Sequence, residues 1–493
     1  MAAPGRLVRG VVIGAAAPAV LVGVDVGTSA LKVAAVTEAG ALVAEHTEPY
    51  PPQPGDGLTE QDAAGWWRAT TAALRRVCAD RPVRAVAVTG QAPTLVAVDA
   101  ALVPRGPALT WADRRAAAEA REVGAWLAAN PPAGRPVTAP ADAFFGTAKL
   151  LWWQRHRADL TGAHRVLAAN GFIVSQLTGE CSLDESTAGL LQGWDGQFAP
   201  AIRRELPVEL FPAVAGCAEI VGTVTGSAAA ACGLPVGVPV VAGAIDAVTS
   251  ALETGTLAAA DPTTVMTGSS TVTVSAVERG ERRDRLIATR HAVPGTDLLI
   301  TATVTAGSVL DWVRRLTGLS QLPEDPAELP ATRPSRLLLS PGFGGERTPT
   351  WDADARGAIS GLDLATGPAD LLLAGYEGTA FALADNLDVL GLPAGAPVRA
   401  SGTAAYSRAW LQLTADVIGR RMARPALGRG ASAGAALLAG LGVGGFDLAD
   451  LRELSAPVAA VAEPDPARAA AYRERLSQWR ALRDAAAHLR SDH

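Results

Sequence analysis

The sequence predicts a duplicated, two-domain α/β fold, and three observations lead to this prediction. The chain has 493 residues, which is too long for one hydrophobic core and suits two domains. Strand-like and helix-like segments alternate along it, which is typical of mainly parallel sheets covered by helices. A strand–turn–strand pattern over residues 21–36 returns in the second half over residues 264–274. We therefore expect two related halves that face each other.

Both copies of this pattern turn through a glycine that is followed by hydroxyl side chains. The first turn is Gly27-Thr28-Ser29 and the second is Gly268-Ser269-Ser270. Glycine permits a positive φ and lets the backbone approach a ligand closely, and successive N–H groups in such a turn form an anion-binding concavity. One such turn in each half predicts a polyphosphate held between the halves.

Composition excludes several classes of protein. Hydrophobic residues make up 49% of the chain and charged residues 19%, as in a folded globular protein. A net charge of −6 and the lack of a Lys/Arg run argue against nucleic acid as a partner. Four separated cysteines form neither a zinc motif nor a disulfide framework, which predicts a reducing, cytoplasmic location. No membrane span is expected. The sequence does not decide whether the chain forms a homodimer.

The first twenty residues are treated separately from the fold. Arg6 and Arg9 precede an apolar run that resembles a secretory signal. The run continues into the first predicted strand, so cleavage at its end would remove part of the first turn. We interpret residues 1–20 as an extension that is disordered or arises from a mis-assigned start codon.

Further strands and helices are expected in the first half of the chain, after the first turn. The run over 41–50 predicts a third strand, and apolar residues at helical spacing after Glu60-Gln61-Asp62 predict a helix with Trp66 and Trp67 on it. Acidic residues at that start suit the helix dipole. The other expected elements are strands over 83–88 and 95–98, helices over 111–129 and around 149–153, and a buried strand over 238–244 that ends at Asp246.

The second half begins near residues 255–262 and opens with the repeated hairpin. Small residues over 431–441 predict a helix, and the charges over 464–490 indicate the solvated face of a final helix. The remaining expected elements are helices over 377–390 and 410–418 and a strand over 398–401.

A series of short motifs, in order from about residue 21 to residue 480, resembles the FGGY family of carbohydrate kinases. The motifs are Val24-Asp25-Val26-Gly27-Thr28-Ser29, Glu60-Gln61-Asp62 with Trp66-Trp67, Gly90-Gln91, Trp111 with Asp113 and Arg115, Lys149 with Trp152, Leu177-Thr178-Gly179-Glu180, Ala242-Gly243-Ala244-Ile245-Asp246, Gly268-Ser269-Ser270, Gly345-Glu346-Arg347-Thr348-Pro349 and Glu377-Gly378-Thr379-Ala380-Phe381.

This resemblance implies a ribonuclease H-like fold of the actin/hexokinase/Hsp70 ATPase type, with an interdomain cleft. It also implies ATP and Mg²⁺ as cofactors and a small sugar as substrate. Residues 21–257 would form the N-terminal domain, with the sugar site, the first phosphate turn and the catalytic base. Residues 258–493 would form the C-terminal domain, with the nucleotide site and the final helix.

Phosphoryl transfer depends mainly on positioning and on neutralising charge. The chain has no glycine-rich loop of the P-loop type, so the two hairpin turns are the expected phosphate contacts. Mg²⁺ usually takes one or two carboxylates together with phosphate and water, and Asp25 is suited to this role. The alternative for Asp25 is a side-chain bond that stabilises its own turn.

A sugar hydroxyl that attacks phosphorus needs a carboxylate to accept its proton. Asp246 ends a buried strand at the expected domain junction, where ligands of α/β proteins usually bind, and it aligns with the family's catalytic base. The alternative is that Asp246 caps the helix that follows.

The sugar pocket departs from the family pattern. After Gln91 the chain has Ala92-Pro93-Thr94, where xylulose kinases usually have Met-His and glycerol kinases have Arg-Glu, which disfavours glycerol. We expect Gln91, Ala92, Pro93, Thr94, Trp111, Asp113 and Asp246 to contact the sugar.

The adenine-side loop also departs from the family pattern. It appears as Gly402-Thr403-Ala404-Ala405-Tyr406-Ser407 and lacks two glycines of the family's loop. Thr403 and Ala404 fit only if φ stays negative, or at a cost of about 1 kcal/mol or more each. We still expect Gly402, Thr403 and Ser407 to contact ATP.

Three hypotheses follow for function. The first is an ATP-dependent kinase for a ketopentose such as xylulose, or for a different polyol or sugar acid. The second is a catalytically silent relative that senses a sugar or a nucleotide, suggested by the altered adenine loop. The third is an actin-like filament former, which the tryptophan-rich stretch and Asp246 disfavour.

Overall fold

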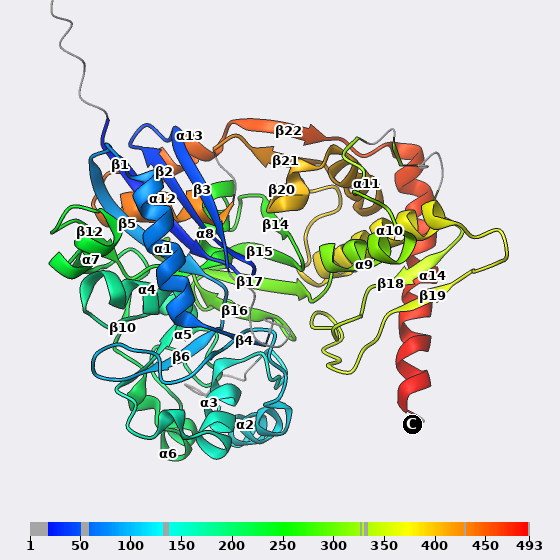
Figure 1. The fold of residues 1–493 in the computed structure, drawn as a ribbon. Helices are drawn as coiled ribbons and strands as arrows, with labels where there is room; N and C mark the ends of the chain where they lie inside the picture. The colour runs from blue at the N-terminus through cyan, green and yellow to red at the C-terminus, as the bar shows by residue number, and fades with distance from the viewer. Residues whose placement is uncertain are drawn as a thin grey trace, which may run out of the picture.

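Two seven-stranded sheets organise the computed structural model, which describes residues 18–50, 59–131, 138–325, 328–329, 334–427 and 430–491 (Figure 1). The first sheet has the order β11-β12-β5-β1-β2-β3, with β13 beside β5, and the second has the order β16-β17-β15-β14-β20-β21-β22. Residues 1–17, which hold most of the predicted extension, lie outside the described residues.

The two sheets repeat one topology. In the first, β1 (Val20–Val26), β2 (Ala30–Thr37) and β3 (Leu42–Pro49) run antiparallel, and β5 (Val83–Gly90) is parallel to β1. In the second, β14 (Thr263–Thr267), β15 (Thr271–Glu278) and β17 (Thr296–Thr303) run antiparallel, and β20 (Val398–Ser401) is parallel to β14. The predicted duplication is confirmed.

The prediction of mainly parallel sheets is wrong, because both sheets are mixed. Each tight glycine turn joins neighbouring strands, and a turn of that length forces them to run antiparallel. The strands joined through helices are the parallel ones. Hydrophobic periodicity reports which face of a strand is buried, and it carries no information about strand direction.

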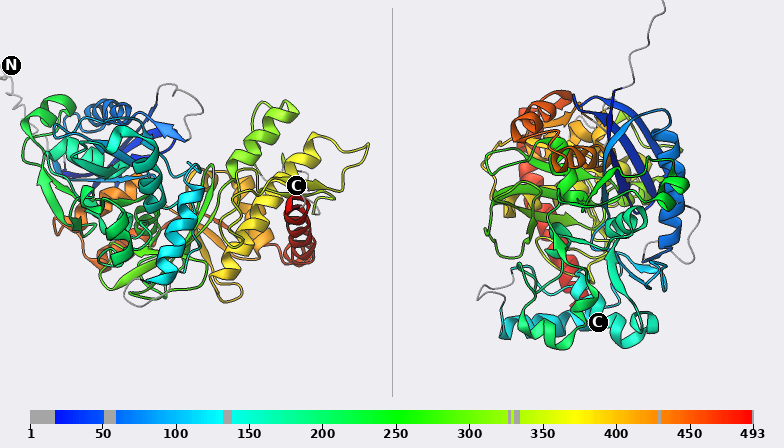
Figure 2. Two further views of the ribbon diagram at one scale, coloured as in Figure 1. Left: turned by 90° about the horizontal axis from the view of Figure 1, so that it is seen from below. Right: turned by 90° about the vertical axis from the view of Figure 1, so that its left-hand side faces the viewer.

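Helices cover both faces of the first sheet, which is why every residue of β1 is buried. One face packs against α1 (Ala63–Val77) and α4 (Ala169–Thr178). The other face packs against α8 (Asp246–Thr254) and α12 (Ala431–Gly442). Helix α12 comes from the second half of the chain and crosses into the first lobe, where Figure 2 (left) shows it in orange.

Small residues allow this crossing helix to approach closely. A Cβ at Gly434 of α12 would lie 1.8 Å from the carbonyl oxygen of Thr249 on α8, and a Cβ at Gly23 of β1 would lie 1.9 Å from the carbonyl oxygen of Ser432. Backbone atoms therefore touch at both places, and no side chain fits between them.

We expect Gly434→Ala to destabilise the protein by at least about 2 kcal/mol, since the new methyl group would overlap a backbone atom that cannot rotate away. Urea unfolding measures the effect. Gly226→Ala is the matched control, because no atom lies within 4 Å of a Cβ there, and it should leave stability within about 0.5 kcal/mol of wild type. Equal stability of the two variants would contradict the packing described.

The remaining strands form small sheets or extend the large ones. They are β4 (Glu60–Gln61), β6 (Leu95–Val98), β7 (Ala108–Leu109), β8 (Arg165–Ala168), β9 (Leu183–Asp184), β10 (Val214–Ala215), β11 (Ile220–Thr223), β12 (Pro239–Val241), β13 (Ala244–Ile245), β16 (Ile287–Arg290), β18 (Leu338–Ser340), β19 (Ala358–Ser360), β21 (Met422–Pro425) and β22 (Val458–Ala462).

The remaining helices lie around the sheets and at the far edge of the second lobe. They are α2 (Ala117–Ala129), α3 (Gly146–His156), α5 (Glu185–Ala188), α6 (Pro200–Glu205), α7 (Gly226–Cys232), α9 (Gly307–Thr317), α10 (Pro368–Val389), α11 (Arg408–Ile418), α13 (Leu448–Ser455) and α14 (Pro466–Ser491). None of the helices in the described ranges is both long enough and apolar enough to cross a membrane.

Several predicted boundaries are wrong. Glu60 and Gln61 form the short strand β4, and Asp62 caps α1 through its side chain, which accepts from the N–H of Ala64. Helix α2 begins at Ala117 rather than at 111, α10 begins at Pro368 rather than at 377, and the strand expected over 238–244 is split into β12 and β13. A positive φ at Gly243 accompanies that break.

Candidate active site

A cavity of about 110 Å³ joins the two halves of the chain. Five of the sequence-predicted site residues line it, namely Thr28, Ala92, Trp111 and Asp246 from the first half and Ser270 from the second. Most of the wall is apolar or aromatic, and the charged groups are Asp246 and Arg347. A small polar molecule in this cavity would therefore meet one acid, one cation and a few hydroxyl groups.

Asp246 is the first residue of α8, and the N-cap position is occupied by Ile245. Asp246 is therefore not the N-cap residue, although its carboxylate interacts with the N–H of Ala247 at the start of the helix. The pKa of Asp246 is raised to about 7, first by burial and then by the nearby Asp25 carboxylate, and this value includes the opposing effects of the N–H of Ala247 and the ammonium of Lys32. A carboxylate with such a pKa is suited to accept a proton from a bound hydroxyl near neutral pH.

Asp25 lies near the end of β1 and is 4% exposed. Its Oδ2 is 3.4 Å from Nζ of Lys32, and its Oδ1 has no hydrogen-bond partner. The side chain of Asp25 thus bonds to Lys32 on the next strand rather than to the backbone of the turn, and the buried free oxygen needs another partner. A divalent cation that is also held by phosphate oxygens fits this donor, since one carboxylate is enough for such a site.

Within the described ranges, no group of three or more His, Cys, Asp or Glu side chains gathers to hold a metal. A metal at Asp25 would consequently depend on a bound polyphosphate for most of its ligands, as a metal that arrives with a nucleotide does.

The side chains of Gln91 and Gln61 fix the first turn through hydrogen bonds to its backbone. Nε2 of Gln91 donates to the carbonyl oxygen of Gly27 (3.2 Å) and to Oε1 of Gln61 (2.8 Å), and Nε2 of Gln61 donates to the carbonyl oxygen of Thr28 (2.8 Å). On the cavity side, Nε1 of Trp111 donates to Oγ1 of Thr28 (3.2 Å). The turn is thus fixed before any ligand binds.

Four residues expected at the sugar are not among those that line the cavity: Gln91, Pro93, Thr94 and Asp113. Thr94 is fully buried and accepts from the N–H of Trp111 (3.2 Å). Asp113 is buried and lies 2.8 Å from Nε of Arg115. The structure places these two behind the wall, and their contact with a sugar stays a prediction.

Backbone N–H groups at the start of α9 form hydrogen bonds with the second turn. The carbonyl oxygen of Ser269 accepts from the N–H of Ala306 (2.8 Å), and that of Gly268 accepts from the N–H of Gly307 (3.0 Å). We expected these glycines to allow a positive φ. That expectation is wrong, because neither Gly27 nor Gly268 has a positive φ. Close approach explains Gly27, where a Cβ would lie 2.8 Å from the carbonyl oxygen of Ala30.

The altered adenine-side loop fits without strain. Gly402 has a φ of 80°, and residues 403–406 form a short 3₁₀ turn in which neither Thr403 nor Ala404 has a positive φ. Ser407 caps α11 by accepting from the N–H of Trp410 (3.2 Å). The loss of two glycines therefore carries no left-handed backbone penalty.

Glu253, at the far end of the same helix as Asp246, was not predicted to matter. Its Oε2 accepts from Oγ of Ser401 (2.7 Å) and its Oε1 from the N–H of Gly430 (2.9 Å). Burial raises its pKa to about 7. Helix α8 thus connects the Asp246 end of the cavity with the start of the adenine-side loop.

Lys149 is another buried charge whose position the sequence did not explain. Its Nζ donates to the carbonyl oxygens of Ala143 (2.5 Å), Phe144 (2.9 Å) and Asp113 (3.2 Å), and burial lowers its pKa to about 7. These bonds tie together two segments of the cavity wall, which carry Phe144 and Trp111.

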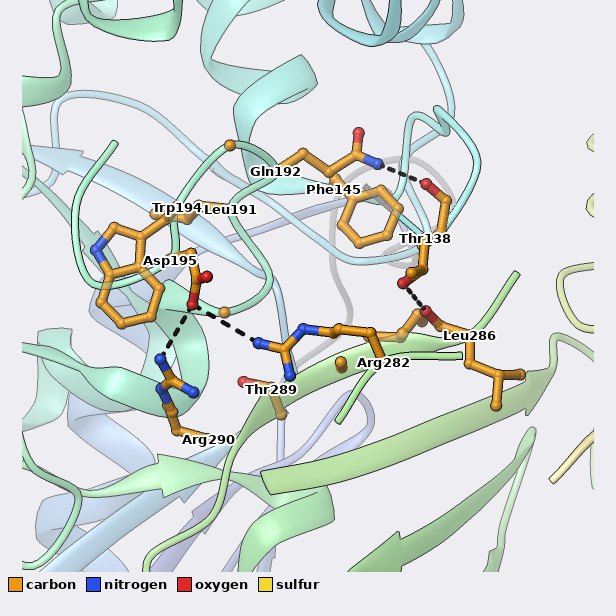
Figure 3. A pocket seen from close by; sticks show the side chains of 15 residues that line it. Thr138, Phe145, Leu191, Gln192, Trp194, Asp195, Arg282, Leu286, Thr289 and Arg290 are labelled. Atoms are coloured by element: carbon orange, nitrogen blue, oxygen red, sulfur yellow. Dashed lines mark hydrogen bonds and ion pairs between the residues drawn. The ribbon is translucent and has the colours of Figure 1, made fainter. Parts of the chain in front are cut away.

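A second cavity of about 90 Å³, drawn in Figure 3, shares the lining residue Ile287 with the first. Its charged groups are Asp195, Arg282 and Arg290, and both arginines also pair with the buried Asp297. Two cations and two carboxylates balance each other there, which leaves no charge free for a ligand.

Comparison with known proteins gives matches over most of the chain. The model of the N-terminal domain of the FGGY family of carbohydrate kinases matches residues 20–252, and the model of its C-terminal domain matches residues 268–443. A xylulose kinase of Escherichia coli K12 is 32% identical over 487 residues, which cover 94% of this chain and 98% of that protein.

Two further relatives agree with this match. A xylulose kinase of Klebsiella pneumoniae is 30% identical, with 92% and 96% of the two chains covered. The crystal structure of a xylulose kinase from Rhodospirillum rubrum superposes with a TM-score of 0.76 at 27% identity, with 94% and 98% covered. The predicted ribonuclease H-like, two-domain kinase fold is confirmed by this structural match.

Proposed function

The chain belongs to the FGGY family of carbohydrate kinases, and on that premise we propose that it transfers the γ-phosphoryl group of ATP to a hydroxyl of xylulose or a closely related ketopentose. It is an ATP-dependent sugar kinase. The observation that carries the proposal is the cavity in which Asp246 meets one phosphate turn from each half of the chain. Similarity to xylulose kinases along nearly the whole chain supports the choice of sugar.

In this proposal the residues act mainly by positioning the sugar hydroxyl and the phosphates of ATP. The turns at 27–29 and 268–270 hold the phosphates through N–H groups and hydroxyls, and Gly402, Thr403 and Ser407 lie on the adenine side. Asp246 accepts the proton of the attacking hydroxyl. Asp25 holds Mg²⁺, which would supply charge neutralisation for the phosphates when bound.

Closure of the two lobes around sugar and nucleotide would exclude water, so that ATP is not spent on hydrolysis. We assign residues 21–257 to the domain with the sugar and the base, and residues 258–493 to the nucleotide domain. Helix α12 of the second domain packs on the first sheet. The four free cysteines support a cytoplasmic location, and a homodimer stays a prediction.

Since Asp246 must be ionised to act, we expect the sugar-dependent rate to fall as the pH decreases. Its raised pKa means that protonation begins at a higher pH than for an ordinary aspartate. The midpoint of the acid limb should lie between 3.8, the ordinary value, and about 7, because a bound cation lowers the pKa of a neighbouring acid. A pH profile of kcat/KM measures this, and a flat profile over that interval would contradict it.

Coupled ADP release with Mg-ATP, measured against ketopentoses, ketohexoses, polyols and aldonates, tests the proposed function. A strong signal with a ketopentose supports it, and a signal with a different polyol or with a sugar acid corrects the substrate. ATP binding without any sugar-dependent ADP release would favour the catalytically silent sensor. Family membership leaves the filament-forming alternative without support.

A further inference from the structure

Arg347 is the one cation among the residues that line the candidate active-site cavity, and it is unusually placed for an arginine. It comes from the second half of the chain, between β18 and β19, and is 5% exposed. Its side chain reaches residues of the first half: its guanidinium carbon lies 3.9 Å from the ring centre of Phe144 and 5.2 Å from that of Trp111.

This guanidinium lacks the partners that a buried arginine needs. Among the described residues it forms no ion pair, and its one hydrogen bond is a long contact of 3.4 Å from Nη2 to the carbonyl oxygen of Trp111. Its Nε is buried without a partner. The nearby carboxylate of Asp142 is already 3.0 Å from Arg114. Burial lowers the pKa of Arg347 to about 9, so the group remains charged at neutral pH.

The contrast with the second cavity is informative. There, Arg282 and Arg290 share Asp195 and Asp297, so their charges are satisfied within the protein. A buried arginine with one weak bond loses hydration without compensation. Packing on aromatic rings offsets part of that cost, and the unused N–H groups are available to a bound molecule.

The loop that carries Arg347 is held firmly in place. Oγ1 of Thr348 accepts from the N–H of Ala302 (2.8 Å), and Arg285 donates to the carbonyl oxygens of Pro349 (2.9 Å) and Thr350 (2.6 Å). The backbone that carries Arg347 is therefore fixed before a substrate binds. A residue that determines specificity needs such a fixed position.

We propose that Arg347 binds the trigonal oxygen of the substrate, the ketone oxygen of an open-chain ketose, in the cavity that Asp246 also lines, and so selects ketoses over alditols. The inference rests on the proposed function. A guanidinium only donates hydrogen bonds, so it matches a ketone oxygen, which only accepts them, better than a hydroxyl, which also carries a hydrogen of its own. An alditol, which has a hydroxyl at that carbon, would leave more of the buried charge unsatisfied. An aldonate presents the same trigonal oxygen chemistry with a negative charge.

The test compares Arg347→Met, Arg347→Lys and wild type on three substrates of equal chain length: xylulose, an alditol made by reducing it, and an aldonate. We expect Arg347→Met to lower kcat/KM for xylulose about 10- to 100-fold relative to the alditol. Arg347→Lys, which keeps the charge but not the planar fork, should restore part of the preference.

The matched control is Arg483→Met. Arg483 also lies over a tryptophan ring, at 5.5 Å from the centre of Trp479, but it belongs to α14 and is not among the residues that line the cavity. It should leave the ratio of the two kcat/KM values unchanged even if stability falls. Equal losses on xylulose and alditol in Arg347→Met would overturn the proposal, because packing alone would then explain the residue.

Calorimetric titration of xylulose separates this inference from the proposed function, since it needs no turnover. Binding to wild type that is weakened in Arg347→Met supports the role of Arg347 even if the transfer reaction proves to be different. Equal binding to both proteins, or no binding to wild type, overturns it. An Arg347-dependent preference for the aldonate would keep the trigonal oxygen but replace the ketose by a sugar acid.

Discussion

Replacing Asp246 by asparagine is expected to lower kcat for the sugar about 10³-fold, while ATP binding stays nearly intact. General-base catalysis typically contributes 10²- to 10⁴-fold, and the amide cannot accept the hydroxyl proton. Asn has the same shape as Asp, and its side-chain oxygen can still accept from the N–H of Ala247 at the start of α8, so the fold should tolerate the change. Coupled ADP release gives the rate, and titration with a non-hydrolysable ATP analogue gives the nucleotide affinity.

Glu377→Gln is the matched control for this prediction. Glu377 is also buried, and burial raises its pKa to about 7, as for Asp246. It accepts from the N–H of Ser335 (2.8 Å) and the hydroxyl of Tyr472 (3.0 Å) rather than lining the cavity, and a glutamine oxygen keeps both bonds. The control should retain most of its activity. Full turnover by Asp246→Asn would remove this residue from the role of base.

The parts of the fold that the sequence predicted well are those with local causes. The two glycine turns, the β20 strand and the helix of small residues over α12 follow from short patterns, because turn geometry and burial act over a few residues. Strand direction was predicted wrongly, and the helix expected from residue 111 begins at Ala117. The preceding segment, with Trp111 and Asp113, belongs to the cavity wall, where tertiary contacts override propensity.

The same distinction holds for the candidate site. Asp25 was predicted from its place beside the first turn and Asp246 from its place at the end of a buried strand, and the structure brings Asp246 together with Thr28 and Ser270 in one cavity. Arg347 and Glu253 were missed as functional residues. Their surroundings depend on segments more than one hundred residues away in sequence, such as Trp111 for Arg347 and Gly430 for Glu253, and no local pattern reports such a contact.

Asp25→Asn is expected to raise the Mg²⁺ concentration needed for half-maximal activity, and to lower kcat/KM, by about 10- to 100-fold each. The amide retains the shape of the carboxylate but loses the charge that attracts a divalent cation, and the buried Oδ1, which now has no partner in the protein, becomes a weaker ligand. Titration of activity with Mg²⁺ at saturating ATP measures the first effect. An unchanged Mg²⁺ requirement would exclude Asp25 from the metal site.

The same substitution makes a second prediction whose sign is fixed by the charges around Asp246. The Asp25 carboxylate raises the pKa of Asp246, whereas the Lys32 ammonium lowers it. At a Mg²⁺ concentration that saturates each variant, Asp25→Asn should therefore shift the acid limb of the pH profile to lower pH, and Lys32→Met should shift it to higher pH. General loosening of the first turn would affect both variants alike, since Asp25 and Lys32 are partners on adjacent strands. Shifts in opposite directions thus separate an electrostatic effect on the base from a structural one, and shifts in the same direction would contradict the assignment of Asp246 as the titrating group.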